Sequence, residues 1–414
     1  MKILIKNIKC LVQVESEPKE KVVGKEMSFL PCIDDAYLMI EGDTISGYGK
    51  MSELVWETEI TDTTIIDATG KMILPSWCDS HTHIVYDGSR EGEFVDRING
   101  LTYEEIAKRG GGILNSANRL HQASEDDLLE QALIRLEEIK MMGTGAVEIK
   151  SGYGLSVEDE LKMLRVIKRL KSRTPLSIKS TFLGAHAIPL EYKNNRKEYI
   201  RLITDEMLPV IAQEKLADFC DVFCDRGFYT PEETDIILKA GIKYGLQPKI
   251  HANELDYSGG IQVGVKNNAL SVDHLEFTGD DEIKALLNSG TMPTLLPSTA
   301  FFLGLHYPPA RKMIEAGLPV ALATDYNPGS SPSGKMSFIL SLACIKLKMT
   351  PEEAINAATI NSAYAMGLSK THGSIAIGKK ANVFITKNIP SYSFIPYSFG
   401  SDLIDTVILN GKIQ

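Results

Sequence analysis

Hydrophobic residues follow two alternating patterns along most of this chain. Short runs of mostly apolar residues have the length of buried strands, and between them apolar positions recur three or four residues apart, as on one face of a helix. The strand-like runs are Met72–Cys78, Ala146–Lys150, Ser177–Leu183, Phe219–Cys224, Gln247–His251, Leu270–His274, Met292–Pro297 and Val320–Thr324. The helix-like stretches include Tyr103–Leu120, Glu125–Met142, Glu158–Lys171 and Pro231–Tyr244.

Strands that alternate with helices in this way predict an α/β fold, here a (β/α)8 barrel of the TIM type. We assign the barrel to residues 73–372. A plain barrel takes about 250 residues, so this segment leaves room for inserted loops. A doubly wound open sheet is the alternative, but no glycine-rich dinucleotide fingerprint follows any predicted strand.

The two ends of the chain carry short strand-like runs broken by turns. Ala36–Gly47 predicts two strands joined by a Glu-Gly-Asp turn, and Ser374–Thr386 and Leu403–Ile413 predict further strands near the C-terminus. Strand-rich pieces at opposite ends of a chain often pair with each other. We therefore expect a small β-sandwich domain built from residues 1–72 plus 373–414.

The composition excludes several classes of protein. The 414 residues are 43% hydrophobic and 24% charged, which is typical of a soluble globular protein. The net charge of -10 and the lack of a Lys/Arg run argue against a nucleic-acid partner, and no apolar run is long enough for a membrane span. Six scattered cysteines fit a reducing compartment. We expect a cytoplasmic protein.

Five of the eight histidines fall at or just after the carboxyl ends of predicted strands, where barrel enzymes keep their catalytic groups. His81 and His83 are two residues apart, so on a strand both imidazoles point to the same face. Together with His251 and Asp325 at later strand ends, they offer three imidazoles and one carboxylate, a ligand set that suits one Zn²⁺ or Fe²⁺ ion. The alternative is that these residues are isolated polar caps on strand ends, but several histidines packed together without a metal would be poorly satisfied.

Several neighbouring residues are candidates for the chemistry itself. Asp325 could bind the metal and also take the proton of a water molecule whose pKa the metal lowers. Glu254, three residues after His251, could either shuttle a proton or only orient a ligand. His186 and His274 could polarise a carbonyl group or hold an oxyanion. The sequence leaves the division of acid and base roles open.

His186 and His274 could instead serve a second metal ion. Such a site usually needs a bridging carboxylate or a modified lysine. Lys179 lies in the middle of its predicted strand, and Lys150 lies at a strand end but on the second strand rather than the fourth. We therefore favour a single metal ion.

A second group of residues is suited to binding substrate. Arg90, shortly after the His-x-His motif, could clamp a carboxylate with two hydrogen bonds, although a loop arginine is more often a surface charge. Tyr153 could donate its hydroxyl to substrate, or could be simply an aromatic residue of a loop. The small-residue segment Asn327–Ser331 could present backbone N–H groups to an anion, or could be only a turn.

Longer stretches around these residues carry a family resemblance over nearly the whole chain. They include "DSHTHIVYDGSREGEF", "VEIKSGYGL", "TFLGAHAIP", "KIHANEL", "SVDHLE" and "LATDYNPGSSPS". The chain resembles the imidazolonepropionase family of the amidohydrolase superfamily. His-x-His alone marks only the superfamily, whereas "SGYGL", "FLGAHA" and "NPGSSP" are much more specific.

The resemblance implies a barrel with a small β domain from both chain ends, and a homodimer. It implies metal bound by His81, His83, His251 and Asp325. The implied activity is hydrolysis of the cyclic amide of 4-imidazolone-5-propanoate to N-formimidoyl-L-glutamate. The substrate contacts that it implies are Arg90, Tyr153, His186, Glu254, His274, Asn327, Gly329 and Ser330.

Two other functions remain open at this point. The "HANE" segment also suits a deaminase that acts on a nucleobase or similar ring, but a neutral base would need no carboxylate clamp at Arg90. A non-catalytic metal-binding or assembly protein could use the same barrel. Such relatives usually lose metal ligands, and none of the four is missing here.

Overall fold

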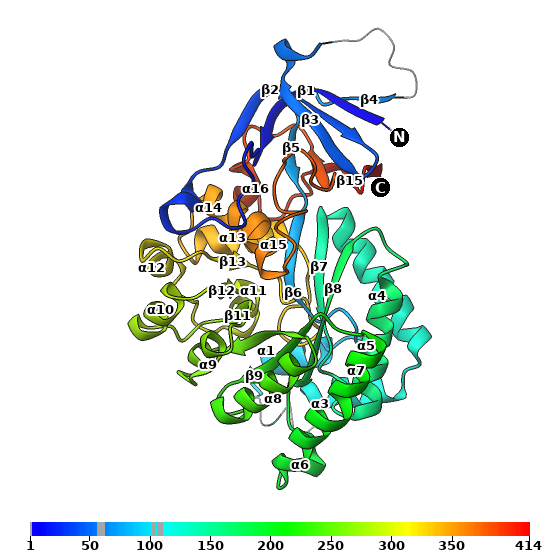
Figure 1. The fold of residues 1–414 in the computed structure, drawn as a ribbon, viewed down its shortest axis with the longest axis vertical. Helices are drawn as coiled ribbons and strands as arrows, with labels where there is room; N and C mark the ends of the chain where they lie inside the picture. The colour runs from blue at the N-terminus through cyan, green and yellow to red at the C-terminus, as the bar shows by residue number, and fades with distance from the viewer. Residues whose placement is uncertain (1, 56–62, 102–104, 106–110) are drawn as a thin grey trace.

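The computed structural model describes residues 2–55, 63–101, 105 and 111–414, and these residues form two sheets of eight strands each. One sheet is built from both ends of the chain and lies at the top of Figure 1, and the other forms the barrel below it. This arrangement confirms the predicted barrel and the separate sheet from both termini.

The barrel strands are parallel and follow one another in chain order around the sheet. They are β6 (Trp77–Thr82), β7 (Thr144–Lys150), β8 (Ser177–Ala185), β9 (Phe219–Cys224), β10 (Gln247–Ala252), β11 (Ser271–His274), β12 (Met292–Leu295) and β13 (Ala321–Leu322). The first and last strands meet at their carboxyl ends, where Asp325 donates its N–H to the carbonyl of His81 at 2.9 Å. His83 in turn donates to the carbonyl of Tyr326 at 2.9 Å. Barrel closure therefore brings two predicted metal ligands together.

The terminal sheet has the strand order β16-β15-β14-β5-β1-β2-β3, with β4 paired to β1. Its strands are β1 (Lys2–Val12), β2 (Cys32–Glu41), β3 (Thr44–Lys50), β4 (Thr63–Asp67), β5 (Met72–Pro75), β14 (Val383–Thr386), β15 (Ile404–Leu409) and β16 (Lys412–Ile413). β2 and β3 are the antiparallel pair that Ala36–Gly47 predicts. The antiparallel pair β5 and β14 joins the N-terminal and C-terminal strands.

The apolar run Met72–Cys78 is not one strand, as the sequence predicts, but two. β5 belongs to the terminal sheet and β6 to the barrel. The change of partner occurs between two neighbouring residues: Ser76 donates its N–H to Asn382 of the C-terminal segment, and Trp77 donates to Gly143 of the barrel, both at 2.9 Å. This short segment therefore fixes the terminal sheet directly to the first barrel strand.

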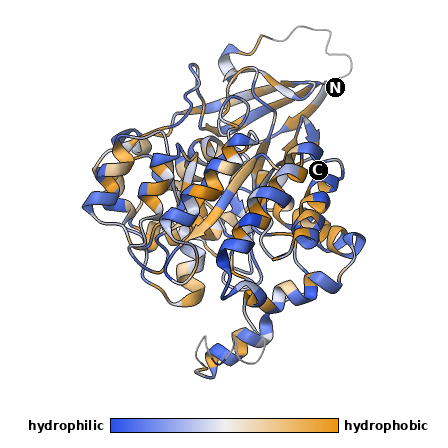
Figure 2. Ribbon diagram, turned by 60° about the horizontal axis from the view of Figure 1, so that its bottom comes forward, coloured by the Kyte–Doolittle hydropathy of each residue, from blue (hydrophilic) through white to orange (hydrophobic). Residues whose placement is uncertain are grey.

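Amphipathic helices surround the barrel, and hydrophilic and hydrophobic residues alternate along them in Figure 2. The α-helices are α1 (Glu91–Ile98), α3 (Ile113–Gln122), α4 (Glu125–Met141), α5 (Val157–Leu170), α6 (Arg196–Arg201), α7 (Leu208–Glu214), α8 (Pro231–Lys243), α9 (Gly260–Lys266), α10 (Asp280–Leu287), α11 (Pro297–Leu303), α12 (Ala310–Glu315), α13 (Met336–Ile345), α14 (Pro351–Asn356), α15 (Ser362–Ala365) and α16 (Phe394–Tyr397). The 3-10 helices are η1 (Gly24–Ser28), η2 (Met51–Glu53) and η3 (Leu190–Tyr192), and the π-helical segments are η4 (Leu202–Met207) and η5 (Ala357–Asn361).

Three of the predicted helices match α4, α5 and α8 closely. The hydroxyl of Thr230 accepts a hydrogen bond from the N–H of Glu233, so it caps α8 directly before Pro231. The prediction over Tyr103–Leu120 falls partly on residues 102–104 and 106–110, which lie outside the described residues. Within the described part, α3 covers its C-terminal portion. No helix among the described residues has the length and apolar character needed to cross a membrane.

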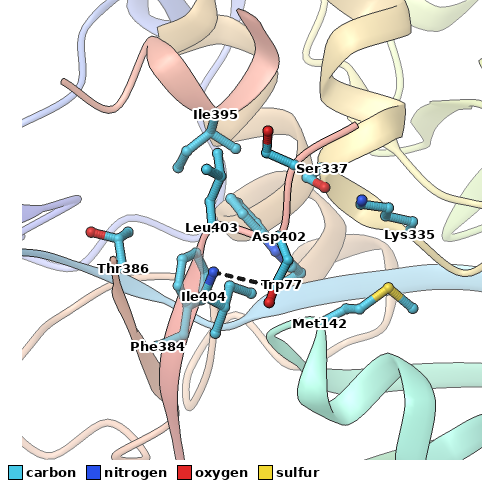
Figure 3. A pocket seen from close by; sticks show the side chains of 11 residues that line it. Trp77, Met142, Lys335, Ser337, Phe384, Thr386, Ile395, Asp402, Leu403 and Ile404 are labelled. Atoms are coloured by element: carbon cyan, nitrogen blue, oxygen red, sulfur yellow. Dashed lines mark hydrogen bonds between the residues drawn. The ribbon is translucent and has the colours of Figure 1, made fainter. Parts of the chain in front are cut away.

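A hollow lies where the terminal sheet meets the barrel (Figure 3). The Trp77 ring at the start of β6 packs 4.9 Å, centroid to centroid, from the Phe384 ring of β14, and Met142 and Leu403 also line the space. Trp77 is at the opposite end of β6 from His81. The hollow is therefore separate from the end of the barrel that carries the predicted site.

Candidate active site

The four predicted metal ligands converge at the carboxyl end of the barrel. Nε2 of His81 and Nε2 of His83 each lie 3.5 Å from Oδ1 of Asp325. The His251 ring lies 4.4 Å, centroid to centroid, from the His81 ring. Ligand atoms of His81, His83 and Asp325 all lie within 4.8 Å of one another, and the same holds for His81, His251 and His274.

Two buried aspartates fix the orientation of these rings. Oδ2 of Asp273 lies 2.6 Å from Nδ1 of His81, and Asp221 lies 3.1 Å from Nδ1 of His251. Because each carboxylate accepts a hydrogen bond from Nδ1–H, Nε2 of each ring is left with its lone pair free for a metal ion. Neither Nε2 atom has a hydrogen-bond partner among the described residues, although both are buried. Orphaned imidazole nitrogens beside a carboxylate fit a divalent metal ion.

Burial keeps these imidazoles in the form that binds metals. It lowers the pKa of His81 and His83 well below the ordinary value, and positive charge on neighbouring lysine or histidine side chains would add to the effect. Burial also lowers the pKa of His186 to about 3. A neutral imidazole offers a lone pair, whereas a protonated one would repel a cation.

Asp325 is held by a residue that the sequence analysis did not single out. The hydroxyl of Thr299, on α11, donates to Oδ2 of Asp325 at 2.6 Å, so Oδ1 remains directed at His81 and His83. Asp325 also adopts a left-handed backbone conformation with φ of 53°. Such conformations cost energy and concentrate at functional sites.

The backbone at the carboxyl end of β11 is also in a left-handed conformation, with φ of 84° at His274 and 70° at Leu275. Nε2 of His274 lies 3.7 Å from Oε2 of Glu254, and its Nδ1 lies 3.9 Å from Oε2 of Glu276. Burial alone would lower the pKa of His274, but the charges of Glu254 and Glu276 outweigh it and raise that pKa. Burial raises the pKa of Glu254. Glu254 and Glu276 thus favour the protonated form of His274.

Glu276 is a second residue that the sequence analysis missed. Its side chain is fully buried, and neither carboxylate oxygen has a hydrogen-bond partner among the described residues. A buried carboxylate of this kind stabilises positive charge on His274. A signal existed in the sequence, because Glu276 follows His274 by two residues in "SVDHLE".

His186 and Tyr153 form one wall of the site. The His186 ring stacks on the His83 ring with an interplanar angle of 15° and a centroid distance of 5.3 Å. Nδ1 of His186 lies 2.9 Å from the carbonyl of Gly152, so this nitrogen donates and Nε2 is left as the acceptor. Burial raises the pKa of Tyr153, and Arg90 and Asp325 are close enough to act on the same hydroxyl. The hydroxyl therefore stays protonated and available as a donor.

Arg90 is not a solvated surface charge. Its Nε and Nη2 donate to Oε2 of Glu93 at 3.0 and 2.6 Å, and the Arg90 side chain is 8% exposed. The other oxygen of Glu93 accepts from the N–H of Gly112 and the amide of Asn115. Glu93, which the sequence analysis also missed, therefore anchors Arg90 to the start of α3.

The Asn327–Ser331 turn lies against Arg90 and is stabilised by hydrogen bonds between its own residues. Oδ1 of Asn327 accepts hydrogen bonds from the N–H groups of Gly329 and Ser330, both at 2.8 Å. Nδ2 of Asn327 donates to the Ser330 hydroxyl at 2.8 Å. Two of the N–H groups in the segment predicted to face an anion are thus engaged by Asn327. The turn instead brings Gly329 into contact with Arg90.

Comparison with known proteins agrees with this geometry. The amidohydrolase family profile matches residues 72–414. An imidazolonepropionase of Flavobacterium johnsoniae is 62% identical over 410 residues, covering 99% of both chains, and one of Geobacillus kaustophilus is 44% identical, covering 99% of this chain and 97% of its own.

Solved structures at low identity share the fold. E. coli guanine deaminase has a TM-score of 0.76 at 15% identity, covering 100% of this chain and 98% of its own. A triazine hydrolase variant has a TM-score of 0.76 at 16% identity, covering 100% and 94%. The family profile and the full-length relatives together establish that this chain is a member of the amidohydrolase family and, within it, of the imidazolonepropionases.

Proposed function

We propose that this chain hydrolyses the ring C–N bond of 4-imidazolone-5-propanoate and releases N-formimidoyl-L-glutamate. Relatives that carry the name imidazolonepropionase match it over their whole length, at 42–62% identity. The observation that carries the proposal is a pair of features at one barrel mouth: a histidine–aspartate cluster with orphaned nitrogens, and a buried arginine held by Glu93. The first suits water activation, and the second suits a substrate carboxylate.

His81, His83, His251 and Asp325 would hold one divalent ion, Zn²⁺ or Fe²⁺. When bound there, such an ion would activate a water molecule and polarise the ring carbonyl. Asp221 and Asp273 would keep Nε2 of His251 and His81 free for it. Metal analysis of the purified protein identifies the ion.

The remaining residues divide between binding and proton transfer. Arg90 would bind the propanoate carboxylate, with Asn327, Gly329 and Ser330 shaping the turn beside it. Tyr153 and His186 would hold the ring through the hydroxyl and Nε2. These contacts fix the ring carbonyl over the cluster, which converts attack by water into a reaction between positioned groups.

During the reaction one C–N bond breaks and one C–O bond forms at the ring carbonyl carbon. Asp325 would accept the proton of the attacking water. His274, which Glu254 and Glu276 favour in its protonated form, would donate a hydrogen bond to the developing oxyanion. Asp325, together with Glu254, would then carry that proton to the leaving ring nitrogen.

Turnover of authentic 4-imidazolone-5-propanoate by the metal-loaded protein tests this function. We expect turnover that is lost after chelation and restored by Zn²⁺ or Fe²⁺. No turnover, together with robust activity on another cyclic amide, would reject the assignment. An Arg90→Ala variant that binds the true substrate as tightly as wild type would favour a deaminase of a neutral base.

We also propose that the protein acts as a homodimer in the cytoplasm. The family resemblance supports the dimer, and the six free cysteines fit a reducing compartment. Sedimentation equilibrium gives the oligomeric state directly. A monomer with full activity would contradict this part of the proposal.

A further inference from the structure

Five charged side chains lie buried inside the barrel, next to the histidine site. They are Glu148, Lys150, Asp221, Lys249 and Asp273, and we call them the buried charge cluster; each side chain is 0% exposed. Buried charges are costly unless they are paired and hydrogen-bonded. The five side chains are paired with one another, so their contacts show what the cluster supports.

Lys150 is the centre of this cluster. Its Nζ lies 2.7 Å from Oε1 of Glu148, 2.7 Å from Oδ2 of Asp221 and 3.6 Å from Oδ2 of Asp273. Burial opposes a charge on Lys150, but the charges of Asp221, Glu148 and Asp273 outweigh it and raise the pKa of Lys150 above its ordinary value. The three carboxylates therefore favour the ammonium form of Lys150.

The two aspartates are the same ones that orient the histidine ligands. Asp221 meets Nδ1 of His251, and Asp273 meets Nδ1 of His81. Two separate strands, β9 and β11, carry these carboxylates, and Lys150 is the one side chain that forms ion pairs with both of them among the described residues. One ammonium group thus links the supports of two ligands that come from β6 and β10.

We propose that Lys150 is a positioning residue for the metal site: it fixes Asp221 and Asp273 relative to each other, so that His251 and His81 direct Nε2 at one cation. The inference rests on the proposed function, because it assumes that the histidine cluster binds metal. An imidazole held by one carboxylate can still swing with it. Two carboxylates tied to one ammonium group cannot move apart, so the spacing between the ligand atoms is set before the ion arrives.

Lys249 provides a matched control within the same cluster. It is equally buried and also contacts Glu148, and its other hydrogen bonds go to the carbonyls of Ser80 at 3.1 Å and Ala365 at 3.3 Å. None of these side-chain hydrogen bonds reaches Asp221 or Asp273. Lys249→Met removes a buried positive charge, as Lys150→Met does, without releasing the two aspartates.

The direction of the change in metal affinity distinguishes a positioning role of Lys150 from a purely electrostatic one. Removing a positive charge near a divalent cation should strengthen metal binding if charge repulsion is all that matters. If Lys150 positions the histidines, its removal should weaken metal binding instead. The two lysines therefore give opposite expectations: weaker binding for Lys150→Met, and unchanged or tighter binding for Lys249→Met.

The experiment measures the Zn²⁺ dissociation constant of the wild type and both variants by competition with a chelator, with circular dichroism as a check on folding. We expect Lys150→Met to weaken binding roughly 10- to 100-fold, the usual cost of losing an outer-shell partner. Unchanged or tighter binding in Lys150→Met, or equal weakening in both variants, would overturn the inference. A wild type that binds Zn²⁺ but does not hydrolyse 4-imidazolone-5-propanoate would instead overturn the proposed function.

Lys150→Gln covers the case in which Lys150→Met fails to fold. Glutamine is neutral but keeps N–H donors that can reach one of the aspartates. We expect the Zn²⁺ affinity of Lys150→Gln to be lower than that of the wild type, but by less than tenfold. Wild-type affinity in this variant would overturn the inference. A second test compares the Asp221→Asn, Asp273→Asn double variant with the triple variant that also carries Lys150→Met. The two should bind Zn²⁺ with similar affinity, because a change at Lys150 should cost little once both of its partners are altered.

Discussion

The backbone of Gly329 lies directly against the guanidinium of Arg90. A Cβ atom at Gly329 would stand 2.1 Å from Nη1 and 2.7 Å from Cζ of Arg90. Arg90 comes from the loop after β6, and Gly329 from the turn after β13, so this contact joins the first and last segments of the barrel mouth. It lies where we propose that the substrate carboxylate binds.

Gly329→Ala should displace Arg90 without unfolding the protein. The atom that must move is the far end of a flexible side chain, so the cost in stability is small. We expect KM to rise about tenfold or more, because a bidentate contact to the carboxylate is lost, while metal content stays the same. Gly92→Ala is the control, since a Cβ there would meet nothing within 4 Å. An unchanged KM for Gly329→Ala would remove Arg90 from substrate binding.

Glu93→Gln tests whether Arg90 must be held in place. Glu93 accepts two hydrogen bonds from Arg90, and its second oxygen is tied to Gly112 and Asn115. We expect KM to rise about tenfold with kcat within a factor of two, because the clamp loses its fixed orientation rather than its charge. Glu91→Gln, at an exposed position of the same helix, should leave both constants unchanged. A lower KM in Glu93→Gln would mean that Glu93 only competes with substrate for the arginine.

Thr299→Val tests the support of Asp325. Valine has nearly the shape of threonine but leaves Oδ2 of this buried carboxylate without its donor at 2.6 Å. Losing a hydrogen bond to a charged group costs about 1.5–3 kcal/mol, so we expect kcat to fall about tenfold or more. Steady-state kinetics at saturating metal measures the effect. Thr299→Ser keeps the hydroxyl and should behave as wild type; equal losses in both variants would point to packing instead.

The sequence predicts the barrel well because the signals for strand and helix are local. The prediction of a single strand is wrong at Met72–Cys78. This run is mostly apolar, but its hydrogen-bond partners change from one sheet to the other after Ser76. Periodicity records which residues are buried. It carries no information about which sheet buries them.

The residues of the site also fall into those that the sequence predicts and those that it does not. Convergence of His81, His83, His251 and Asp325 follows from parallel strands, whose carboxyl ends must share one face. The residues that act through them are harder to find. Asp221 and Asp273 leave a trace as charges inside buried strands, whereas Thr299 and Glu93 look like ordinary helix residues until their tertiary contacts are known.

His372 gives a stability prediction away from the site. It is 6% exposed, and its ring nitrogens lie 2.9 Å from the Ser177 hydroxyl and 2.8 Å from the Thr371 hydroxyl. Burial, aided by the charges of Lys380 and Lys379, lowers the pKa of His372 from 6.5 to about 4. The folded protein therefore keeps this imidazole neutral at a pH where the unfolded chain already binds a proton.

The sign of the pH effect follows from that difference in pKa. Above pH 6.5 the imidazole is neutral in both states, and its contribution to the free energy of unfolding is intact. As the pH falls toward 4 only the unfolded chain gains the proton, so stability should drop by on the order of 3 kcal/mol. Urea unfolding of wild type and His372→Gln at pH 7 and pH 4.5 isolates this contribution, because glutamine does not titrate. The wild type should lose more stability than the variant over this interval, and equal losses would show that His372 does not contribute.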